Sequence, residues 1–351
     1  MATERERFEA TVRGERPEGI LYTAGFTPDL KRRLVEHAGT EDLAGHYGLF
    51  SPVGVMPRRP EGRRPPDYSA YYAGEDLPEG TRLNADGVAM VPSGYYHFYG
   101  YHSPLRHADA LEQIEGYPVG DESDWPTDHM AGAVDEAHRA GRVAQGVVGH
   151  MYETAWQIRG YEPFLVDLIE RPEWAGCMLD KLLARNLVRA RAAARAGADL
   201  LHCGDDVANQ KAMMFSVPMW REFMLSRWAR VWSAALAIRP DIQIWYHSDG
   251  NIRAIIPELL EAGVTILNPI QPECMDPAEL RRAWGDLTMH GTVGTQSTMP
   301  WGTPEDVRRV VAERIATCGA RGRLILGPTH VLEPEVPIAN FEAYVEAARR
   351  G

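Results

Sequence analysis

The stretch IWYHSDGNIRAIIPELLEAGVTILNPIQ, from Ile244 to Gln271, carries the pattern that decides the fold. An apolar run ends in His247 and Asp249, turns at Gly250, continues with apolar residues three and four positions apart, and leads into a second apolar run. Short apolar runs are typical of buried strands, and the three- to four-residue spacing is typical of a helix. The stretch therefore predicts a strand, a helix and a second strand. It also raises a question, because Asp249 either caps the helix or belongs with His247 to a working site.

The same strand and helix unit recurs along the chain. Apolar runs that end in small or polar residues lie at 20–26, 144–152, 198–206, 242–250, 264–271, 287–295 and 323–330. Seven predicted strands are close to the eight of a (β/α)8 barrel, and a Gly at or near each end of the later helical stretches is a common helix stop. A doubly wound sheet is the alternative, but no GxGxxG turn follows the first strand. We expect residues 1–351 to form a single α/β domain with the (β/α)8 TIM-barrel fold.

The segment 50–118 interrupts this rhythm and is rich in Pro, Gly and Tyr. Long irregular segments in compact domains commonly serve function. We interpret the segment as an insertion within the barrel domain that covers one barrel mouth, with a small hairpin around Gly87–Tyr96. Its aromatic run, SGYYHFYGYH at 93–102, either lines the entrance or pairs as an ordinary strand. Tyr96 is the candidate for substrate contact in this segment.

The composition limits the classes of partner. A chain of 351 residues with 44% hydrophobic and 25% charged residues is typical of a globular protein, and the net charge of −12 argues against a generic nucleic-acid or anionic-membrane surface. Four scattered cysteines without a CxxC pair indicate neither a disulfide framework nor a zinc ribbon. No apolar stretch approaches the ~20 residues of a membrane span, and the N-terminus has no apolar core of a signal peptide. We expect a cytoplasmic protein that acts on a small molecule.

Polar residues gather where the predicted strands end. The carboxyl ends of barrel strands carry the chemistry in this fold, and the residues at those ends are His150, Tyr152, Cys203, Asp205, Asp206, His247, Asp249, Asn268, Gln271, His290, Gln296 and His330. Any single one of them is as easily explained as a helix cap. Several strand ends that converge on one mouth favour a site.

Four longer stretches add a family resemblance. GDDVANQKAMMFSVPMWREF (204–223), YHSDGNIRAIIPELLEAGVTILNPIQP (246–272), GTVGTQSTMPWGTPEDV (291–307) and LILGPTHVLEPEVPIANFEAYVEAAR (324–349) together resemble the uroporphyrinogen decarboxylase superfamily. That superfamily also holds the zinc methyltransferases of corrinoid and coenzyme M pathways. The resemblance covers nearly the whole chain and implies the (β/α)8 barrel. It also allows a homodimer, because members of the family often pair.

Two departures from the family pattern bear on function. True uroporphyrinogen decarboxylases carry an Arg-rich stretch after the first strand, whereas this chain has TAGFTPDLKRRL at 23–34. A substrate with many carboxylates needs several fixed cations, so porphyrinogen decarboxylation is not expected. The methyltransferases bind zinc through a His-x-Cys strand end and a distant Cys. The resemblance places His247, Asp249 and His330 at those positions. Asp205, Asp206 or Cys203 could supply a fourth ligand or the general acid or base.

This ligand set predicts a metal with nitrogen and oxygen ligands. Two imidazoles and a carboxylate suit zinc, and also iron(II), and the i, i+2 spacing of His247 and Asp249 puts both on one face if the strand continues. Without a thiolate the site leans away from plain thiol methylation and toward Lewis-acid chemistry, although thiol methylation is not excluded. Adjacent side chains on a strand point to opposite faces, so one of Asp205 and Asp206 is expected to be structural. That residue would hold the loop or cap a helix beginning near Val207.

Three functional classes follow. The first is a metal-dependent enzyme that transfers a methyl or one-carbon group, with a corrinoid protein as a possible methyl donor or acceptor. The second is a carboxy-lyase acting on a smaller acid, in which Asp205 or Asp206 stabilises developing charge. The third is a non-catalytic binding barrel, which the number of polar strand ends disfavours. We assign catalytic roles to Asp205, Asp206, Tyr246, Gln296 and His150, and substrate contacts to Tyr152, Asn268, Gln271, Gln210 and Tyr96.

Overall fold

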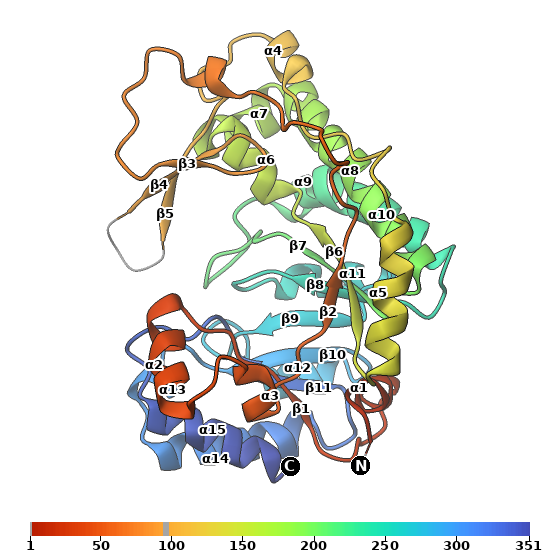
Figure 1. Cartoon of the computed structure of the whole chain (residues 1–351), viewed down its shortest axis with the longest axis vertical. Helices are drawn as coiled ribbons and strands as arrows, with labels where there is room; N and C mark the ends of the chain where they lie inside the picture. The colour runs from red at the N-terminus through yellow and green to blue at the C-terminus, as the bar shows by residue number, and fades with distance from the viewer. Residues whose placement is uncertain (1, 94–97) are drawn as a thin grey trace.

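The structure, a computed structural model, describes residues 2–93 and 98–351. Its centre is a curled sheet of eight strands in the order β1-β11-β10-β9-β8-β7-β6-β2, in which all paired neighbours are parallel (Figure 1). Its strands are β1 (Leu21–Tyr22), β2 (Val53–Val55), β6 (Ala144–Gly149), β7 (Leu200–Gly204), β8 (Gln243–His247), β9 (Ile266–Ile270), β10 (Thr288–Val293) and β11 (Leu324–Pro328). The Phe50 N–H donates to the Tyr22 carbonyl at 2.7 Å, which brings the chain before β2 against β1. The arrangement is a TIM-like barrel.

The seven predicted strands are all present, and the eighth strand lies where an insertion was expected. β2 falls inside segment 50–118, so the first part of that segment belongs to the barrel. Only three residues long and flanked by Pro52 and Pro57, β2 has no long apolar run to reveal it. The rest of the segment forms η1 (Ser69–Tyr72), α4 (Leu111–Gly116) and an antiparallel sheet of β3 (Arg82–Leu83), β4 (Ala89–Pro92) and β5 (Tyr99–His102).

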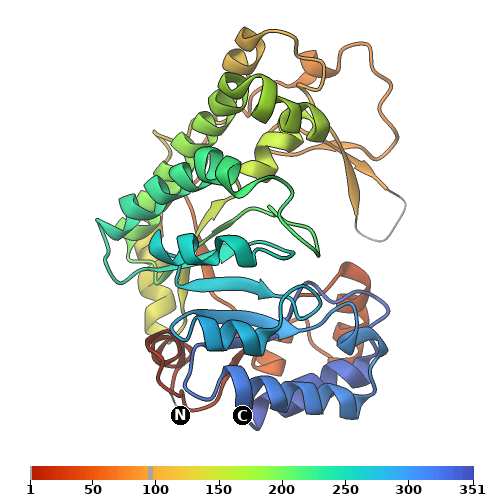
Figure 2. The same ribbon diagram turned by 180° about the vertical axis from the view of Figure 1, so that it is seen from behind.

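The expected hairpin is formed by β4 and β5, a few residues later than predicted. Residues 94–97 between these strands, including Tyr96, lie outside the described residues. In Figures 1 and 2, β9 points toward the side of the molecule on which the β3–β5 sheet lies. The Tyr101 ring of β5 contacts Trp156, which belongs to α6 (Tyr152–Arg159), with ring centroids 5.4 Å apart. The small sheet therefore lies against the helix that follows β6.

Helices cover the outer face of the large sheet (Figure 2). The other helical segments are α1 (Glu4–Arg13), α2 (Pro28–Ala38), α3 (Leu43–Tyr47), α5 (Asp128–Arg139), α7 (Tyr161–Glu170), α8 (Pro172–Ala196), α9 (Val217–Trp220), η2 (Arg221–Leu225), α10 (Ser226–Leu236), η3 (Arg253–Ile255), α11 (Ile256–Glu261), α12 (Pro277–Ala283), α13 (Thr298–Trp301), α14 (Pro304–Cys318) and α15 (Ile338–Arg349). None of the helices in the described ranges is both long and apolar enough to cross a membrane.

Alternation along the strands separates two cores. On β7, Leu200 packs in a small cluster with Trp245 and Phe8, whereas Leu201 and Cys203 pack in the large cluster between sheet and helices. Successive strand residues face opposite sides of a sheet, so His202 faces the barrel interior, where its ring lies 5.8 Å from the Trp245 ring. The barrel interior is thus filled at one end by apolar side chains and carries imidazoles above them.

The contact of α8 with β6 depends on a glycine. A Cβ atom added at Gly146 would lie 2.3 Å from the Ala193 Cβ atom of α8 and 2.8 Å from the Leu201 Cδ2 atom. Gly146→Ala should therefore lower the free energy of unfolding by about 1–3 kcal/mol, because helix and strand must separate. Urea denaturation measures the loss. Gly54→Ala on neighbouring β2 is the control, since its added methyl group meets only Val147 at 3.6 Å. Equal losses in the two variants would refute this packing argument.

Candidate active site and metal centre

Asp205, which follows β7, anchors the site. Its side chain is fully buried, and its Oδ1 atom accepts the N–H groups of Met151 at 2.7 Å and Glu153 at 3.2 Å. Its Oδ2 atom accepts the indole N–H of Trp228 on α10 at 2.7 Å. Burial raises the pKa of Asp205 to about 6, against the opposing effect of His150 and these hydrogen bonds. Asp205 is the structural member of the adjacent pair, and the helix that it caps is α6, not one beginning near Val207.

The cap on α6 brings a first group of potential ligands together. His150 Nδ1 lies 2.5 Å from Glu153 Oε2, and ligand atoms of His150, Glu153 and Asp205 all lie within 4.8 Å of one another. Burial acts to lower the pKa of His150, but the hydrogen bond and charge of Glu153 outweigh it and the pKa is raised. Glu153 was not among the residues predicted from the sequence. Its signal was its position three residues after His150 at a helix start, where both side chains share one face.

A second group forms at the ends of β7 and β8. Ligand atoms of Asp206, His247 and Asp249 lie within 4.8 Å of one another. The Asp206 Oδ1 atom accepts the N–H of Asp249 at 2.8 Å and lies 3.4 Å from His247 Nε2. Burial and the neighbouring Asp206 raise the pKa of Asp249. Burial would also raise the pKa of Asp206, but the hydrogen bond and charge of His247 lower it.

Asp249 is not a helix cap. The following turn and helix begin at Arg253 and Ile256, and the Arg253 N–H bonds to the Asn251 side chain at 3.2 Å instead. Within the described ranges no donor reaches the Asp249 Oδ1 atom, although that atom is buried. A buried carboxylate oxygen without a donor is costly unless a cation or ligand satisfies it. Asp249 therefore does not cap the following helix, and its buried Oδ1 atom is available to a cation or ligand.

Gly250 makes the sharp exit from β8 possible. Its φ is +87°, and a Cβ atom there would lie 2.6 Å from the Asn209 carbonyl oxygen. The Gly250 N–H donates to Gln271 Oε1 at 2.6 Å. Glycine adopts positive φ without strain and leaves room for this close approach. Gln271, assigned above to substrate contact, uses its carbonyl oxygen to hold the turn that carries Asp249.

A chain of hydrogen bonds orients His247 from the barrel interior. His247 Nδ1 lies 2.6 Å from Asn268 Oδ1, the Asn268 amide nitrogen bonds to His290 Nδ1, and His290 Nε2 lies 2.8 Å from Thr23 Oγ1. An amide oxygen only accepts and an amide nitrogen only donates, so His247 carries its proton on Nδ1 and His290 leaves Nδ1 free. Burial lowers the pKa of His290 to about 3, in keeping with a neutral ring. Asn268 is therefore a positioning residue.

This series of hydrogen bonds orients the His247 ring so that its second nitrogen, Nε2, faces Asp206. Burial acts to lower the pKa of His247, but its hydrogen bonds with Asp206 and Asn268 raise it to about 9. A ligating histidine commonly donates its other N–H to a neighbouring acceptor, which fixes the tautomer. His247 shows this arrangement, with Nδ1 bound to Asn268 and Nε2 facing the carboxylates.

The two groups adjoin and form one site. The rings of His150 and His247 lie 6.4 Å apart between centroids, and the Asp206 N–H bonds to Glu153 Oε2 at 3.4 Å. The donor set consists of imidazole nitrogens and carboxylate oxygens, which suits zinc or iron(II). Asp206 and Asp249 are two partly buried carboxylates side by side, and the Asp249 Oδ1 atom has no donor from the described chain. The residues present therefore fit a divalent cation.

Two predicted site residues point away from this site. The Cys203 Sγ atom accepts the indole N–H of Trp232 on α10 at 3.2 Å, behind the sheet. Tyr246 is fully buried, and its ring makes edge contacts with those of Trp228 and Trp232. Both lie one position from an interior-facing residue and so face the helix layer. The predictions of Cys203 as a metal ligand and Tyr246 as a catalytic residue are wrong.

The remaining predicted residues lie around the mouth or behind its wall. Tyr152 is fully buried with its ring against Phe164 and Phe215, so the predicted substrate contact is wrong in this structure. The exposed side chains of Gln210 and Gln296 join the loops after β7 and β10 by a hydrogen bond of 2.7 Å. His330 is exposed and lowers the pKa of Asp249, but it belongs to neither ligand group. Asp206, and not His330, lies in one group with His247 and Asp249.

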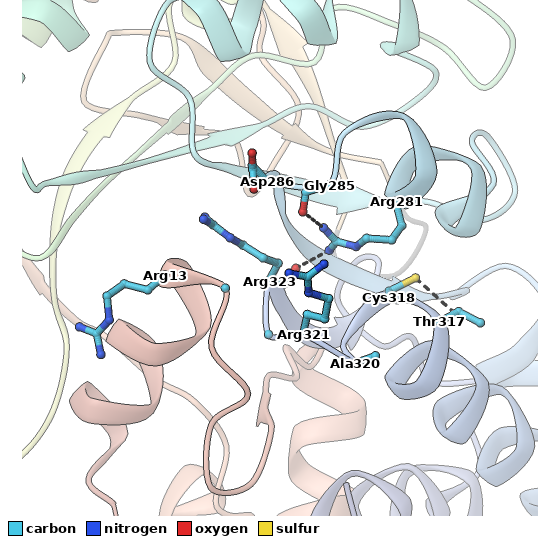
Figure 3. A pocket seen from close by; sticks show the side chains of 11 residues that line it. Arg13, Arg281, Gly285, Asp286, Thr317, Cys318, Ala320, Arg321 and Arg323 are labelled. Carbon is cyan, nitrogen blue, oxygen red and sulfur yellow. Dashed lines mark hydrogen bonds between the residues drawn. The ribbon is translucent and has the colours of Figure 1, made fainter.

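A basic cavity lies at the opposite, N-terminal end of the barrel (Figure 3). Its volume is about 370 Å³, and it lies beside the segments that precede β10 and β11. In Figure 3, Arg281 bonds to the Gly285 carbonyl and to Arg323, and its bonds also include the Leu287 carbonyl at 2.9 Å. These contacts brace loops, whereas Arg13 points away from the other arginines in the figure. This cavity is separate from the site at the carboxyl ends of the strands.

Comparisons with known proteins agree with the fold. The sequence model of the family described as uroporphyrinogen decarboxylase (URO-D) matches residues 104–351. A methyltransferase from Methanosarcina mazei superimposes with a TM-score of 0.67 and 17% identity, covering 100% of this chain and 99% of that chain. Xylanase 10B from Thermotoga petrophila gives a TM-score of 0.40 and 12% identity, covering 68% and 84%. No curated protein matches the chain. At this identity the likeness to the methyltransferase establishes a shared fold.

The two adjacent aspartates should differ in their effect on stability. Asp205→Asn places an amide NH₂ group against bound donors, so the free energy of unfolding should fall by about 1–3 kcal/mol. Asp206→Asn keeps an oxygen that can accept the Asp249 N–H but loses the ion pair with His247, so the free energy of unfolding of the metal-free protein should fall by less than about 1 kcal/mol. Urea midpoints of the two metal-free variants test the assignment. A larger loss in Asp206→Asn would reverse the roles given to the pair.

Proposed function

Because the chain belongs to the uroporphyrinogen decarboxylase family, we propose that it is a metal-dependent enzyme that transfers a methyl or other one-carbon group on a small molecule. The observation that carries the proposal is the buried Asp249 Oδ1 atom, which has no donor from the described residues and lies in one group with Asp206 and His247. Two carboxylates and an imidazole that converge in this way are a suitable ligand set for a divalent cation.

Asp206, His247 and Asp249 would hold the cation, and zinc is our first choice, with iron(II) as the alternative. When bound, the ion would supply a Lewis acid that polarises or activates an oxygen or sulfur atom of the substrate. Asn268 holds His247 in the required orientation through the Nδ1–H bond. Asp206, in place of His330, is the third ligand in this proposal.

His150 and Glu153 are the groups that would move a proton in this site. They form a 2.5 Å pair on the mouth side of the site, and the His150 ring lies beside that of His247. Glu153 raises the pKa of His150, so His150 holds a proton more firmly than a free imidazole. His150 is therefore the proposed general acid toward a leaving or accepting group of the substrate. Asp205, with both oxygens engaged, is a positioning residue.

Two further expectations belong to the proposal. A corrinoid protein would act as methyl donor or acceptor, as the resemblance to corrinoid-linked methyltransferases implies. The β3–β5 sheet would cover the mouth while the methyl group moves, and the Tyr101 contact with Trp156 on α6 supports this position. A cover that excludes water protects a reactive one-carbon group.

The second candidate is a carboxy-lyase that acts on a small acid. The description of the matched family, uroporphyrinogen decarboxylase, favours this chemistry. Asp206 would then be the carboxylate that stabilises charge developing on the substrate, because both oxygens of Asp205 are already engaged.

Metal content tests the centre directly. Asp249→Asn keeps the shape of the side chain but removes one of the charges that balance a dication, so metal occupancy and activity should fall by about tenfold or more. The melting temperature of the metal-free protein should stay nearly unchanged, because the buried Asp249 Oδ1 atom has no hydrogen bond from residues 2–93 and 98–351 to lose. Elemental analysis of the purified variants measures occupancy. Asp241→Asn, an exposed aspartate before the same strand, is the matched control. Full metal content in Asp249→Asn would remove Asp249 from the centre.

Methylcobalamin distinguishes the two candidate reactions. Incubated with the metal-loaded protein and a panel of small thiols, alcohols and carboxylic acids, it should lose its methyl group, and the loss should require His247 and Asp249. The cobalamin absorbance spectrum follows this reaction. Release of CO₂ from one of the acids without methylcobalamin would establish the lyase instead.

A further inference from the structure

A second cavity adjoins the site and is lined by arginines. Its volume is about 560 Å³, and the end of β6, with Gly149 and His150, forms part of its wall. Arginines from the loop after β2 and from α8 form much of the remaining lining. His150 belongs both to this cavity and to the first ligand group, so a molecule in the cavity reaches the proposed acid.

The cavity is positive although the chain is acidic. Five arginines line it, against three carboxylates, in a protein whose net charge is −12. A concave surface lined by one sign of charge concentrates the field and attracts ions of opposite sign. The stretch after the first strand, TAGFTPDLKRRL at 23–34, does not contribute to this cavity. The fold gathers the arginines from the loop after β2 and from α8.

Two of these arginines stabilise loops around the cavity. Arg189 makes a two-pronged ion pair with the buried Glu122 and donates to the Val148 carbonyl at 3.0 Å. Arg63 pairs with Asp124 on the surface. These contacts tie the loops at 56–66 and 120–125 to the barrel, and an ion-pair cluster that holds loops needs no ligand.

Two other arginines of the cavity are not explained by that structural role. The Arg59 guanidinium lies over the Trp125 ring, 5.6 Å from the centroid, and makes no ion pair within residues 2–93 and 98–351. Arg64 likewise has no ion pair in these ranges, and both side chains are exposed. Arg185, which is only 7% exposed, pairs with Asp86 and adds positive charge to the lining. Arg59 and Arg64 are therefore the cations of the lining that an anion can reach.

We propose that this cavity binds an oxyanion group, a carboxylate or a phosphate, of the small molecule on which the enzyme acts. Arg59 and Arg64 would contact the anion at the cavity rim, and the charge of Arg185 in the lining would add to the attraction. Planar guanidinium groups bind carboxylates and phosphates through paired hydrogen bonds. The anion would hold the molecule with its other end at His150. That the cavity binds an anion is independent of the proposed function, whereas the identity of the bound molecule as the substrate, with its other end at His150, rests on it.

Anion binding is measured on the metal-free protein, so that its outcome is independent of the metal centre. Titration calorimetry with inorganic phosphate and, separately, with succinate, at constant ionic strength, should give saturable binding of at least one of them. Phosphate alone would identify a phosphorylated ligand, and succinate alone a carboxylate ligand. No saturable binding of either anion would overturn the proposal.

Matched variants locate the binding. The double variant Arg59→Gln and Arg64→Gln alters exposed side chains. Its affinity for the anion should be about tenfold lower or more, because two charge-assisted contacts are lost. Arg58→Gln, next in the chain but outside the cavity lining, and Arg321→Gln in the cavity of Figure 3 should bind as the unaltered protein does. Equal weakening in Arg58→Gln or Arg321→Gln would show a nonspecific charge effect and refute the site.

Discussion

The carboxylate of Asp205 is the constraint on which the site depends. A fully buried carboxylate must be satisfied, and Asp205 takes its donors from two backbone N–H groups at the start of α6 and from the indole of Trp228 on α10. It thereby fixes where α6 begins relative to β7. His150 and Glu153 stand at that beginning, and the next residue after Asp205 points the opposite way, toward His247. Two consecutive aspartates thus serve two purposes, because adjacent side chains alternate in direction.

Without a bound cation, the second ligand group lowers the stability of the fold. Asp206 and Asp249 lie side by side in a partly buried place, and the pKa of Asp249 is raised by burial and by its neighbour. Repulsion of this kind destabilises a fold unless a positive group balances it, and His247 supplies only part of the balance. The hydrogen-bond chain through Asn268 on β9 and His290 on β10 to Thr23, which follows β1, holds His247 in place. Such strain at a rigidly supported site is typical of function and not of stability.

Opposite charges lie next to each other around His150. On one side is the cluster of carboxylates that fits a cation, and on the other is the arginine-lined cavity. Each would attract a different part of one small molecule or its cofactor. His150 borders both, and its pKa reflects the balance, since burial acts against its proton and Glu153 favours it. A polar division of this kind orients a bound molecule before any chemistry occurs.

The sequence by itself determined the repeated strands and helices and the polar strand end at YHSDG, because apolar periodicity and glycine positions are local signals. The alternation of side chains along β7 and β8, which turns Cys203 and Tyr246 toward the helices, was also predictable from the sequence, although it was not applied to these two residues. Only the tertiary structure decided that β2 completes the sheet, that Asp206 and not His330 joins His247 and Asp249, and that arginines of the loop after β2 and of α8 share one cavity. These facts join residues far apart in the chain. They depend on strand order and on how loops pack at the barrel mouth, which no local pattern encodes.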